Sequence, residues 1–200
     1  MAQGAPSVSG VVLAAGASTR MGRPKQLLSF HGKPLLQHVL DTAEEAGLDE
    51  IILVLGHAAD EIRDALAPST KVHVVRNADH ASGHASSLRA GLLAASPRSA
   101  AAVILLGDQP TMTVDRIQAV IREYGRSGTP VARADYDGTP GHPVVLARTI
   151  WDEVSAGEGD EGAKPVLARH PEWVTRVSLQ GSPPLEVDTP DDYRRLVAEA

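Results

Sequence analysis

Residues 8–25 read VSGVVLAAGASTRMGRPK, an apolar run that passes directly into a loop of small and basic residues. The run Val8–Ala14 is short, unbroken and rich in valine, which is typical of a strand covered on both faces in a parallel sheet. In open α/β sheets, ligands bind beyond the carboxyl ends of the strands. The loop that follows Ala14 is therefore a candidate ligand-binding segment.

Similar apolar runs recur at Ile51–Leu55, Val72–Val75, Ala102–Leu106 and Val144–Ala147. Helical patterns lie between them: an apolar repeat after Pro34 that ends at Gly47, then Ala58–Ala67, His84–Ala95 and a segment from Thr113 to about Tyr124. This alternation predicts one Rossmann-like α/β domain over residues 1–200, a three-layer α/β/α sandwich with a mixed, mostly parallel sheet. After Arg126 the pattern loosens, and we expect Gly138–Pro143 and Gly157–Gly162 to form loops or turns.

The composition excludes several classes of function. Aromatic residues make up only 3% of the 200 residues and the net charge is −6, which argues against a nucleic-acid partner. The absence of cysteine excludes disulfides, thiolate metal sites and a cysteine nucleophile, and it fits the reducing cytoplasm. No apolar run approaches about 18 residues, and the start MAQGAPSVSG lacks the pattern of a signal peptide, so we expect no membrane partner.

The loop after the first strand has the composition of an anion site. Small residues at positions 14–18 let backbone N–H groups approach an anion closely, and Arg20 and Lys25 add the positive charge that a triphosphate needs. The spacing is neither that of a P-loop nor that of a dinucleotide-binding fingerprint. The alternative is an ordinary glycine-rich turn with solvated charges. We expect Lys25 to be an exposed loop residue that contributes little to folding, so that Lys25→Ala lowers activity far more than stability.

Two aspartates are candidate metal ligands. Asp108 follows the run Ala102–Leu106, where a carboxylate could hold Mg²⁺ against phosphates; the alternative is a turn aspartate before Pro110. Asp188 precedes Thr189, a candidate cap for a C-terminal helix that leaves the Asp188 carboxylate free. If a short strand at residues 185–187 joins the sheet beside Asp108, both carboxylates could reach one metal. Alternatively, Asp188 only ties the last helix to the sheet.

The segment Leu13–Leu28, LAAGASTRMGRPKQLL, resembles the signature of the MobA-like NTP transferases, and most closely that of the molybdenum cofactor cytidylyltransferases. Further segments that resemble this family follow in the expected order: Asn77, Ala81–Leu88, GDQP at Gly107–Pro110, Gly141–Val144, Gly159–Lys164 and Val187–Tyr193. Two positions depart from the family pattern, because His84 stands at an often apolar position and Lys164 stands where arginine is usual.

The resemblance implies transfer of CMP from CTP to a phosphorylated substrate, most closely molybdopterin in its molybdenum-bearing form, with release of pyrophosphate and Mg²⁺ as cofactor. Arg20, Lys25 and Asp108 would be catalytic, and Asp108 and Asp188 would hold the metal. The nucleotide would contact Leu13, Ala14, Ala15, Gly16, Gly83 and Ser87. His142 would face the pterin-type second substrate, with a turn histidine as the alternative.

Two other functions fit the same sequence. The acceptor could be a different phosphate, such as a sugar phosphate or phospholactate. The chain could also be a non-catalytic carrier or maturation factor for a molybdenum enzyme, although the joint presence of Arg20, Lys25 and Asp108 favours an enzyme. The implied partners are thus an NTP and a pterin-type substrate, with a transient contact to a molybdenum enzyme or its maturation factor.

Overall fold

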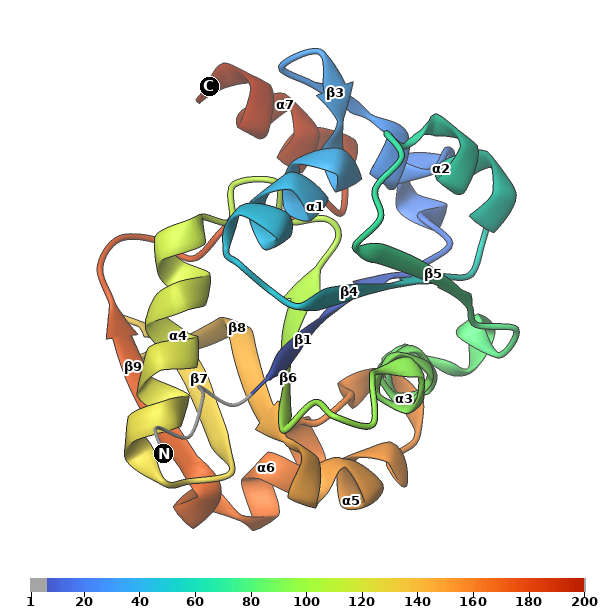
Figure 1. Ribbon diagram of the computed structural model, residues 1–200. Coiled ribbons are helices and arrows are strands. Elements are labelled where there is room, and N and C mark those ends of the chain that lie inside the picture. The colour runs from blue at the N-terminus through green and yellow to red at the C-terminus, as the bar shows by residue number, and fades with distance from the viewer. Residues whose placement is uncertain (1–6, 200) are drawn as a thin grey trace.

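The computed structural model describes residues 7–199, so the first six residues of the segment judged for a signal peptide lie outside the described range. The main strands are β1 (Val8–Ala14), β4 (Glu50–Leu55), β5 (Val72–Arg76), β6 (Ala101–Leu106), β7 (Val131–Tyr136), β8 (Thr139–Ala147) and β9 (Val174–Leu179). The helices are α1 (Leu35–Glu45), α2 (Ala59–Ala65), α3 (His84–Ala94), α4 (Val114–Ser127), α5 (Trp151–Ser155), α6 (Lys164–Arg169) and α7 (Pro190–Ala198) (Figure 1). A short hairpin of β2 (Ser29–Phe30) and β3 (Lys33–Pro34) stands apart from the main sheet.

The main sheet has the order β5-β4-β1-β6-β8-β7-β9. Neighbours from β5 to β6 are parallel, β8 runs antiparallel to both β6 and β7, and β7 is parallel to β9. This arrangement confirms the predicted mixed, mostly parallel sheet. It also brings the carboxyl ends of β1, β4 and β6 to one edge, where the loop after β1 begins.

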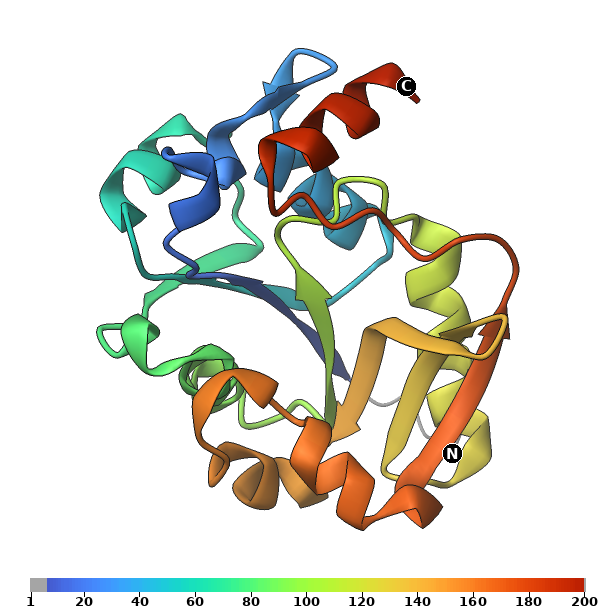
Figure 2. The ribbon, with the colours of Figure 1, turned by 180° about the vertical axis from the view of Figure 1, so that it is seen from behind.

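Helices cover both faces of the sheet. One core cluster joins the sheet to α1, α2 and α4, with fully buried Leu36, Ile62 and Ile117 as examples. The other joins the opposite face to α3, α5 and α6 through side chains such as Leu92 and Trp151. The two views of the ribbon show α4 in front of β7–β9 and α3 with α5 and α6 on the other side (Figures 1 and 2). The predicted three layers are therefore confirmed.

The C-terminal part is more regular than its sequence pattern predicted. Residues 139–143, expected in a loop, belong to β8, because Asp137 and Gly138 adopt positive φ and turn the chain from β7 directly into β8. The segment Gly157–Gly162 is a turn, as predicted, with a 3-10 helix at Gly159–Glu161. The expected strand at residues 185–187 was wrong, because that stretch is irregular.

No helix within residues 7–199 is both long enough and apolar enough to span a bilayer.

Candidate functional site

The loop after β1 lies directly against the end of β6. Leu13 pairs with Leu106 in the parallel ladder, and Gly107 donates its N–H to the Leu13 carbonyl at 2.9 Å. A Cβ on Gly107 would lie 2.8 Å from the Cβ of Ala14, a separation that side-chain carbons do not tolerate. Glycine at 107 therefore allows the loop to approach the turn that carries Asp108.

The buried side chain of Gln26 holds the loop in its conformation, a role that was not predicted from the sequence. This side chain is 2% exposed and donates from Nε2 to the carbonyls of Ala14 at 2.9 Å and Gly16 at 3.3 Å. Its Oε1 accepts from the Ser18 hydroxyl at 3.3 Å, and Ser18 Oγ accepts from the Lys25 N–H at 3.1 Å. A buried polar side chain with its hydrogen bonds satisfied fixes a local conformation.

Four charged side chains meet above this loop. The Lys25 ammonium lies 2.6 Å from Oδ2 of Asp108 and 2.7 Å from Oδ1 of Asp188. Arg20 lies 3.0 Å from the other oxygen of Asp188. The structure thus brings together all four residues that the sequence analysis assigned to phosphate and metal chemistry. We name Arg20, Lys25, Asp108 and Asp188 the charged cluster.

Asp188 reaches the cluster without the expected strand. A single backbone hydrogen bond, from the Val187 N–H to the Asp108 carbonyl at 3.0 Å, joins the two aspartate segments. The predicted cap is confirmed: Thr189 and Asp192 form a reciprocal capping box at the start of α7. Because this box satisfies the helix start, the Asp188 carboxylate is free to bind Lys25 and Arg20.

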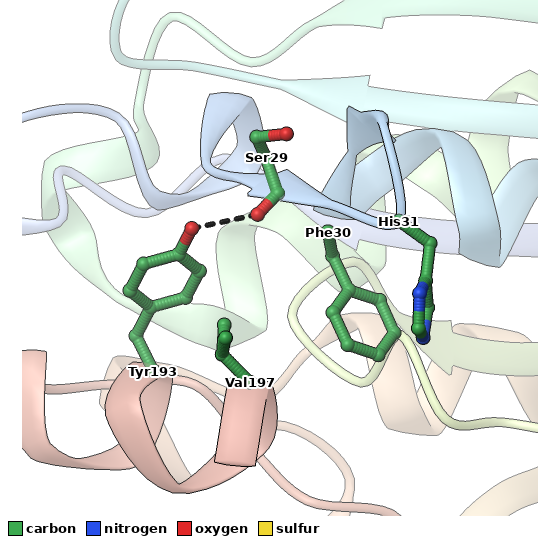
Figure 3. Close-up of a pocket in the computed structure, with 5 residues that line it drawn as sticks. All are labelled: Ser29, Phe30, His31, Tyr193 and Val197. Carbon is green, nitrogen blue, oxygen red and sulfur yellow. Dashed lines mark hydrogen bonds between the residues drawn. The ribbon is translucent and has the colours of Figure 1, made fainter. Parts of the chain in front are cut away.

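Helix α7 also contacts the segment that follows Lys25. The Tyr193 hydroxyl donates to the Ser29 carbonyl at 2.6 Å (Figure 3). These two residues, with Phe30, His31 and Val197, line a surface hollow, and none of the four cluster residues is part of its lining. The contact orients α7, and through it Asp188.

The expectation of an exposed Lys25 was wrong. Its side chain is only 13% exposed, because it lies between two carboxylates instead of pointing into solvent. Burial opposes the charged ammonium, but Asp108 and Asp188 outweigh that effect and raise the pKa of Lys25. For Asp188, burial is again the opposing factor, and the hydrogen bond and charge of Lys25, followed by Arg20, hold its pKa below the ordinary value. Lys25 therefore contributes to folding as well as to the site.

The chemistry of the cluster suits a divalent cation bound together with phosphates. Oδ1 of Asp108 is buried and has no hydrogen-bond partner, so one carboxylate oxygen is available as a ligand. Hard cations prefer such oxygens. Within residues 7–199, no three His, Asp or Glu side chains gather in a way that would hold a metal alone. The remaining ligands would come from the nucleotide or from water.

Gln109, which follows Asp108, connects the cluster to a further acid. Its side chain is buried and donates from Nε2 to Oε1 of Glu186 at 3.0 Å. Glu186 is not recognisable from the sequence, because a lone acid in an irregular stretch has no pattern that marks it.

Three of the expected nucleotide contacts, Ala15, Gly83 and Ser87, lie on the α3 side of the loop, whereas Ala14 packs in the core cluster of the opposite face. Ala15 is 5% exposed and its methyl group packs in the core cluster beneath the loop. Gly83, with φ of +110°, begins α3, and a Cβ there would lie 2.4 Å from the Gly159 backbone. Ser87 is buried and its hydroxyl accepts from Nδ2 of Asn77 at 3.1 Å, so its oxygen already has a partner within the protein.

His142 lies at a second cationic location, near the start of β8. Burial, followed by the charges of Lys164 and His84, lowers its pKa to about 4, so the imidazole is neutral at pH 7. The Tyr136 hydroxyl donates to the His142 carbonyl at 2.7 Å, which fixes the backbone at this position. A neutral imidazole keeps one N–H that can donate to a ligand.

The cations and carboxylates of the charged cluster lie beyond the carboxyl ends of β1 and β6, where open α/β sheets bind their ligands. Residues 10–174 match the MobA-like NTP transferase domain, and the chain belongs to that family. The family and the fold support nucleotidyltransferase activity, as the resemblance implied.

Solved structures match nearly the whole chain. Rv0371c from Mycobacterium tuberculosis is 39% identical, with a TM-score of 0.85 over 98% of this chain and 100% of that one. The same protein has been solved with manganese, at 38% identity and a TM-score of 0.82, covering 97% and 100% of the two chains. That complex is consistent with a divalent metal in this family. A Methanothermobacter nucleotidyl transferase is 25% identical, with a TM-score of 0.80 over 96% of this chain and 97% of that one.

One relative is named as an oxidoreductase and not as a nucleotidyltransferase. Nicotine blue oxidoreductase from Paenarthrobacter nicotinovorans is 33% identical over an alignment of 202 positions, which covers 96% of this chain and 97% of that protein. Family membership alone therefore does not fix the substrate.

Proposed function

We propose that this chain transfers CMP from CTP to the phosphate of an acceptor, and that the acceptor is molybdopterin in its molybdenum-bearing form. The observation that carries the proposal is the charged cluster, in which two cations of the loop after β1 face two carboxylates at the edge of the sheet. Nucleotidyl transfer needs positioning and charge neutralisation more than covalent catalysis, and the cluster supplies both.

The reaction forms one bond and breaks one. An oxygen of the acceptor phosphate attacks the α-phosphorus of CTP, and the bond from that phosphorus to the bridging oxygen breaks, so pyrophosphate leaves. Arg20 and Lys25 neutralise the charge that grows on the leaving group. Asp108 and Asp188 would hold Mg²⁺, which supplies charge neutralisation on the phosphates when bound. Backbone groups at Leu13–Gly16, with Gly83 and Ser87, would position the nucleotide, and His142 would face the acceptor.

Release of pyrophosphate tests the proposal. Protein, CTP, Mg²⁺ and the molybdenum-bearing pterin should give pyrophosphate and the cytosine dinucleotide. Asp108→Asn should abolish this release, whereas Asp115→Asn, an exposed acid on α4, should not change it. Release with a sugar phosphate or phospholactate instead would identify a different acceptor. Tight pterin binding without release from any acceptor would indicate a carrier.

The name of the Paenarthrobacter relative adds one arm to this test. Consumption of reduced nicotinamide without pyrophosphate release would replace nucleotidyl transfer by oxidoreduction. The sequence does not favour that outcome, because the loop after β1 lacks the dinucleotide-binding spacing. We further propose that residues 1–200 act as one domain in the cytoplasm and pass the product to a molybdenum enzyme or its maturation factor.

A further inference from the structure

The face of β7 and β9 that points away from α4 carries two arginines. In β7, Ala132 and Ala134 pack in the core cluster under α4, so Arg133 between them points to the opposite face. In β9, Val177 packs against that same cluster, so Arg176 also points away from α4. Seen from behind, β7, β8 and β9 lie in front of α4, with α5 and α6 below them where β7 and β9 begin (Figure 2).

The two arginines are direct neighbours. Arg133 is paired with Arg176 in the parallel register of β7 and β9. Adjacent strands are about 4.8 Å apart, and like charges directly opposite each other on one face destabilise a sheet. The protein contains 25 acidic residues and has a net charge of −6, yet the residue paired with Arg133 is a second arginine and not an acid.

Neither guanidinium has a partner in the described part of the chain, residues 7–199. No hydrogen bond or ion pair is formed by the side chain of Arg133 or of Arg176, and Nε of Arg133 is buried without an acceptor. Asp135 lies two residues further along β7, but its Oδ1 accepts from the Gly138 N–H at 2.7 Å and it makes no ion pair with Arg133. Burial, followed by the charge of Arg176, lowers the pKa of Arg133, and the nearby charge of Asp135 only partly offsets them.

A paired guanidinium site with an unsatisfied donor is suited to an oxyanion. Guanidinium groups present fixed forks of N–H donors that match phosphate and carboxylate oxygens. Violations of local rules that have no compensation inside the protein concentrate at functional sites. An anion would neutralise the repulsion between the two arginines and accept the buried Nε–H.

We propose that Arg133 and Arg176 form an oxyanion site for the acceptor substrate, which therefore carries a second anionic group besides the phosphate that receives the nucleotide. The inference rests on the proposed function. Arg133 is level with Val144 of β8 and, through it, with Ile104 of β6, four residues before Asp108. β6 ends at Leu106, so its extended part above Ile104 adds about 7 Å along the strand, and two strand spacings of about 4.8 Å separate β6 from β7, which places Arg133 roughly 12 Å from the end of β6 that leads to Asp108. The acceptor is accordingly an extended molecule with anionic groups at both ends.

The test observes the arginine directly and needs no turnover. The Nε–Hε resonance of Arg133, assigned from its loss in Arg133→Gln, is followed by NMR while inorganic phosphate or acetate is added, with chloride at equal ionic strength as the reference. We expect a saturable shift of this resonance with the oxyanion and none with chloride. A larger response to phosphate than to acetate would identify a tetrahedral group, and the reverse a carboxylate.

Two variants complete the experiment. Arg176→Gln should weaken phosphate binding at Arg133 at least about tenfold, because one charged hydrogen-bonding partner is removed. Arg122→Gln, an exposed arginine on α4, should leave it unchanged. The proposal is overturned if Arg133 does not respond to either oxyanion, if chloride gives the same shift, or if CTP with Mg²⁺ alone occupies the site. A response without any pyrophosphate release would overturn the proposed function and leave this site in place.

Discussion

The ammonium group of Lys25 lies 2.7 Å from Oδ1 of Asp188, although 163 positions separate the two residues in the chain. Lys25 belongs to the loop after the first strand, and Asp188 precedes the last helix. The contact therefore closes the site with a segment from the other end of the chain. The α7 cap at Thr189 and the hydrogen bond from Tyr193 to Ser29 attach that last segment next to the site.

Replacing Lys25 by methionine should reduce both turnover and stability. The change keeps an unbranched side chain that is one atom shorter, and it leaves Asp108 and Asp188 without their shared cation. Leaving partly buried acceptors unpaired costs about 1–3 kcal/mol of unfolding free energy. Loss of a positive charge on the departing pyrophosphate costs about 2–4 kcal/mol of transition-state stabilisation. Urea unfolding and pyrophosphate release measure the two effects separately.

Lys33→Met is the matched control for that variant. Lys33 also forms a 2.7 Å ion pair, with Asp41, but its side chain is 56% exposed. Exposed pairs contribute little to stability, so both measurements should stay close to those of the parent protein. Normal turnover in Lys25→Met would contradict the role of this lysine.

Asp188→Asn should raise the Mg²⁺ concentration needed for half-maximal turnover by at least about tenfold, which corresponds to about 1.4 kcal/mol of binding free energy. The substitution keeps the shape of the side chain and removes the charge that a hard cation prefers. Asp191→Asn on α7, an exposed acid, serves as the control. An unchanged Mg²⁺ requirement, or a destabilised protein with normal specific activity, would assign Asp188 to the attachment of α7.

The fold was predicted correctly where a residue pattern is compatible with only one kind of secondary structure. The run Val8–Ala14 became β1 with those same bounds, because a short valine-rich run between polar segments suits a buried strand. Residues 139–143 contain glycine and two prolines, which resemble a loop, yet they continue β8 beyond its pairing with β6. Turn-forming residues predict a loop only where tertiary pairing does not override them.

The site followed the same rule. Arg20 and Lys25 were identified as the basic residues of the loop after β1, Asp108 because it follows a strand end, and Asp188 because it precedes a helix cap. Gln26 was missed, because its role depends on carbonyl groups that only the folded loop presents to it. The pairing of Arg133 with Arg176 depends on which strands become neighbours, and no spacing within the sequence contains that information.

Gln26→Glu should disorder the loop after β1. A glutamate at this position has no donor for the carbonyls of Ala14 and Gly16, and its negative oxygen would face them. We expect a loss of about 1–3 kcal/mol of unfolding free energy and a higher KM for CTP. Gln118→Glu is the control, since Gln118 makes only a 3.4 Å hydrogen bond to Ala46. If the Gln26→Glu protein is destabilised but its KM for CTP is unaltered, the conformation of this loop does not determine CTP binding.

CTP should be preferred over GTP, because the resembled cytidylyl enzymes tend to carry Ala-Ala-Gly where guanylyl relatives carry Ala-Gly-Gly. The Ala15 methyl packs in the core beneath the loop, so it sets the position of the loop and thereby the room for a base. A difference of one methyl group gives about 1–3 kcal/mol of discrimination. Competition between CTP and GTP measures the ratio of their kcat/KM values, and Ala15→Gly should make this ratio smaller. Equal kcat/KM values for the two nucleotides in the parent protein would contradict it.

Acidification should destabilise the folded protein through His142. Its folded-state pKa of about 4 lies below the ordinary value of 6.5, so between these values the unfolded chain binds the proton more tightly. The stability linked to this group is fully present above pH 6.5 and is lost as the pH falls toward 4. Going from pH 7 to pH 5 should cost about 2 kcal/mol from this residue.

His142→Gln should remove that part of the pH dependence, since glutamine does not titrate. Urea unfolding of parent and variant at pH 7 and pH 5 isolates the contribution, and His73→Gln, an exposed histidine on β5, should keep the dependence of the parent. Burial is the main cause of the shift, followed by Lys164 and His84, so Lys164→Gln should raise the pKa of His142 only in part. If imidazole resonances show His142 titrating near 6.5, the residue is hydrated, and its proposed role as a neutral donor to the acceptor fails with the stability prediction.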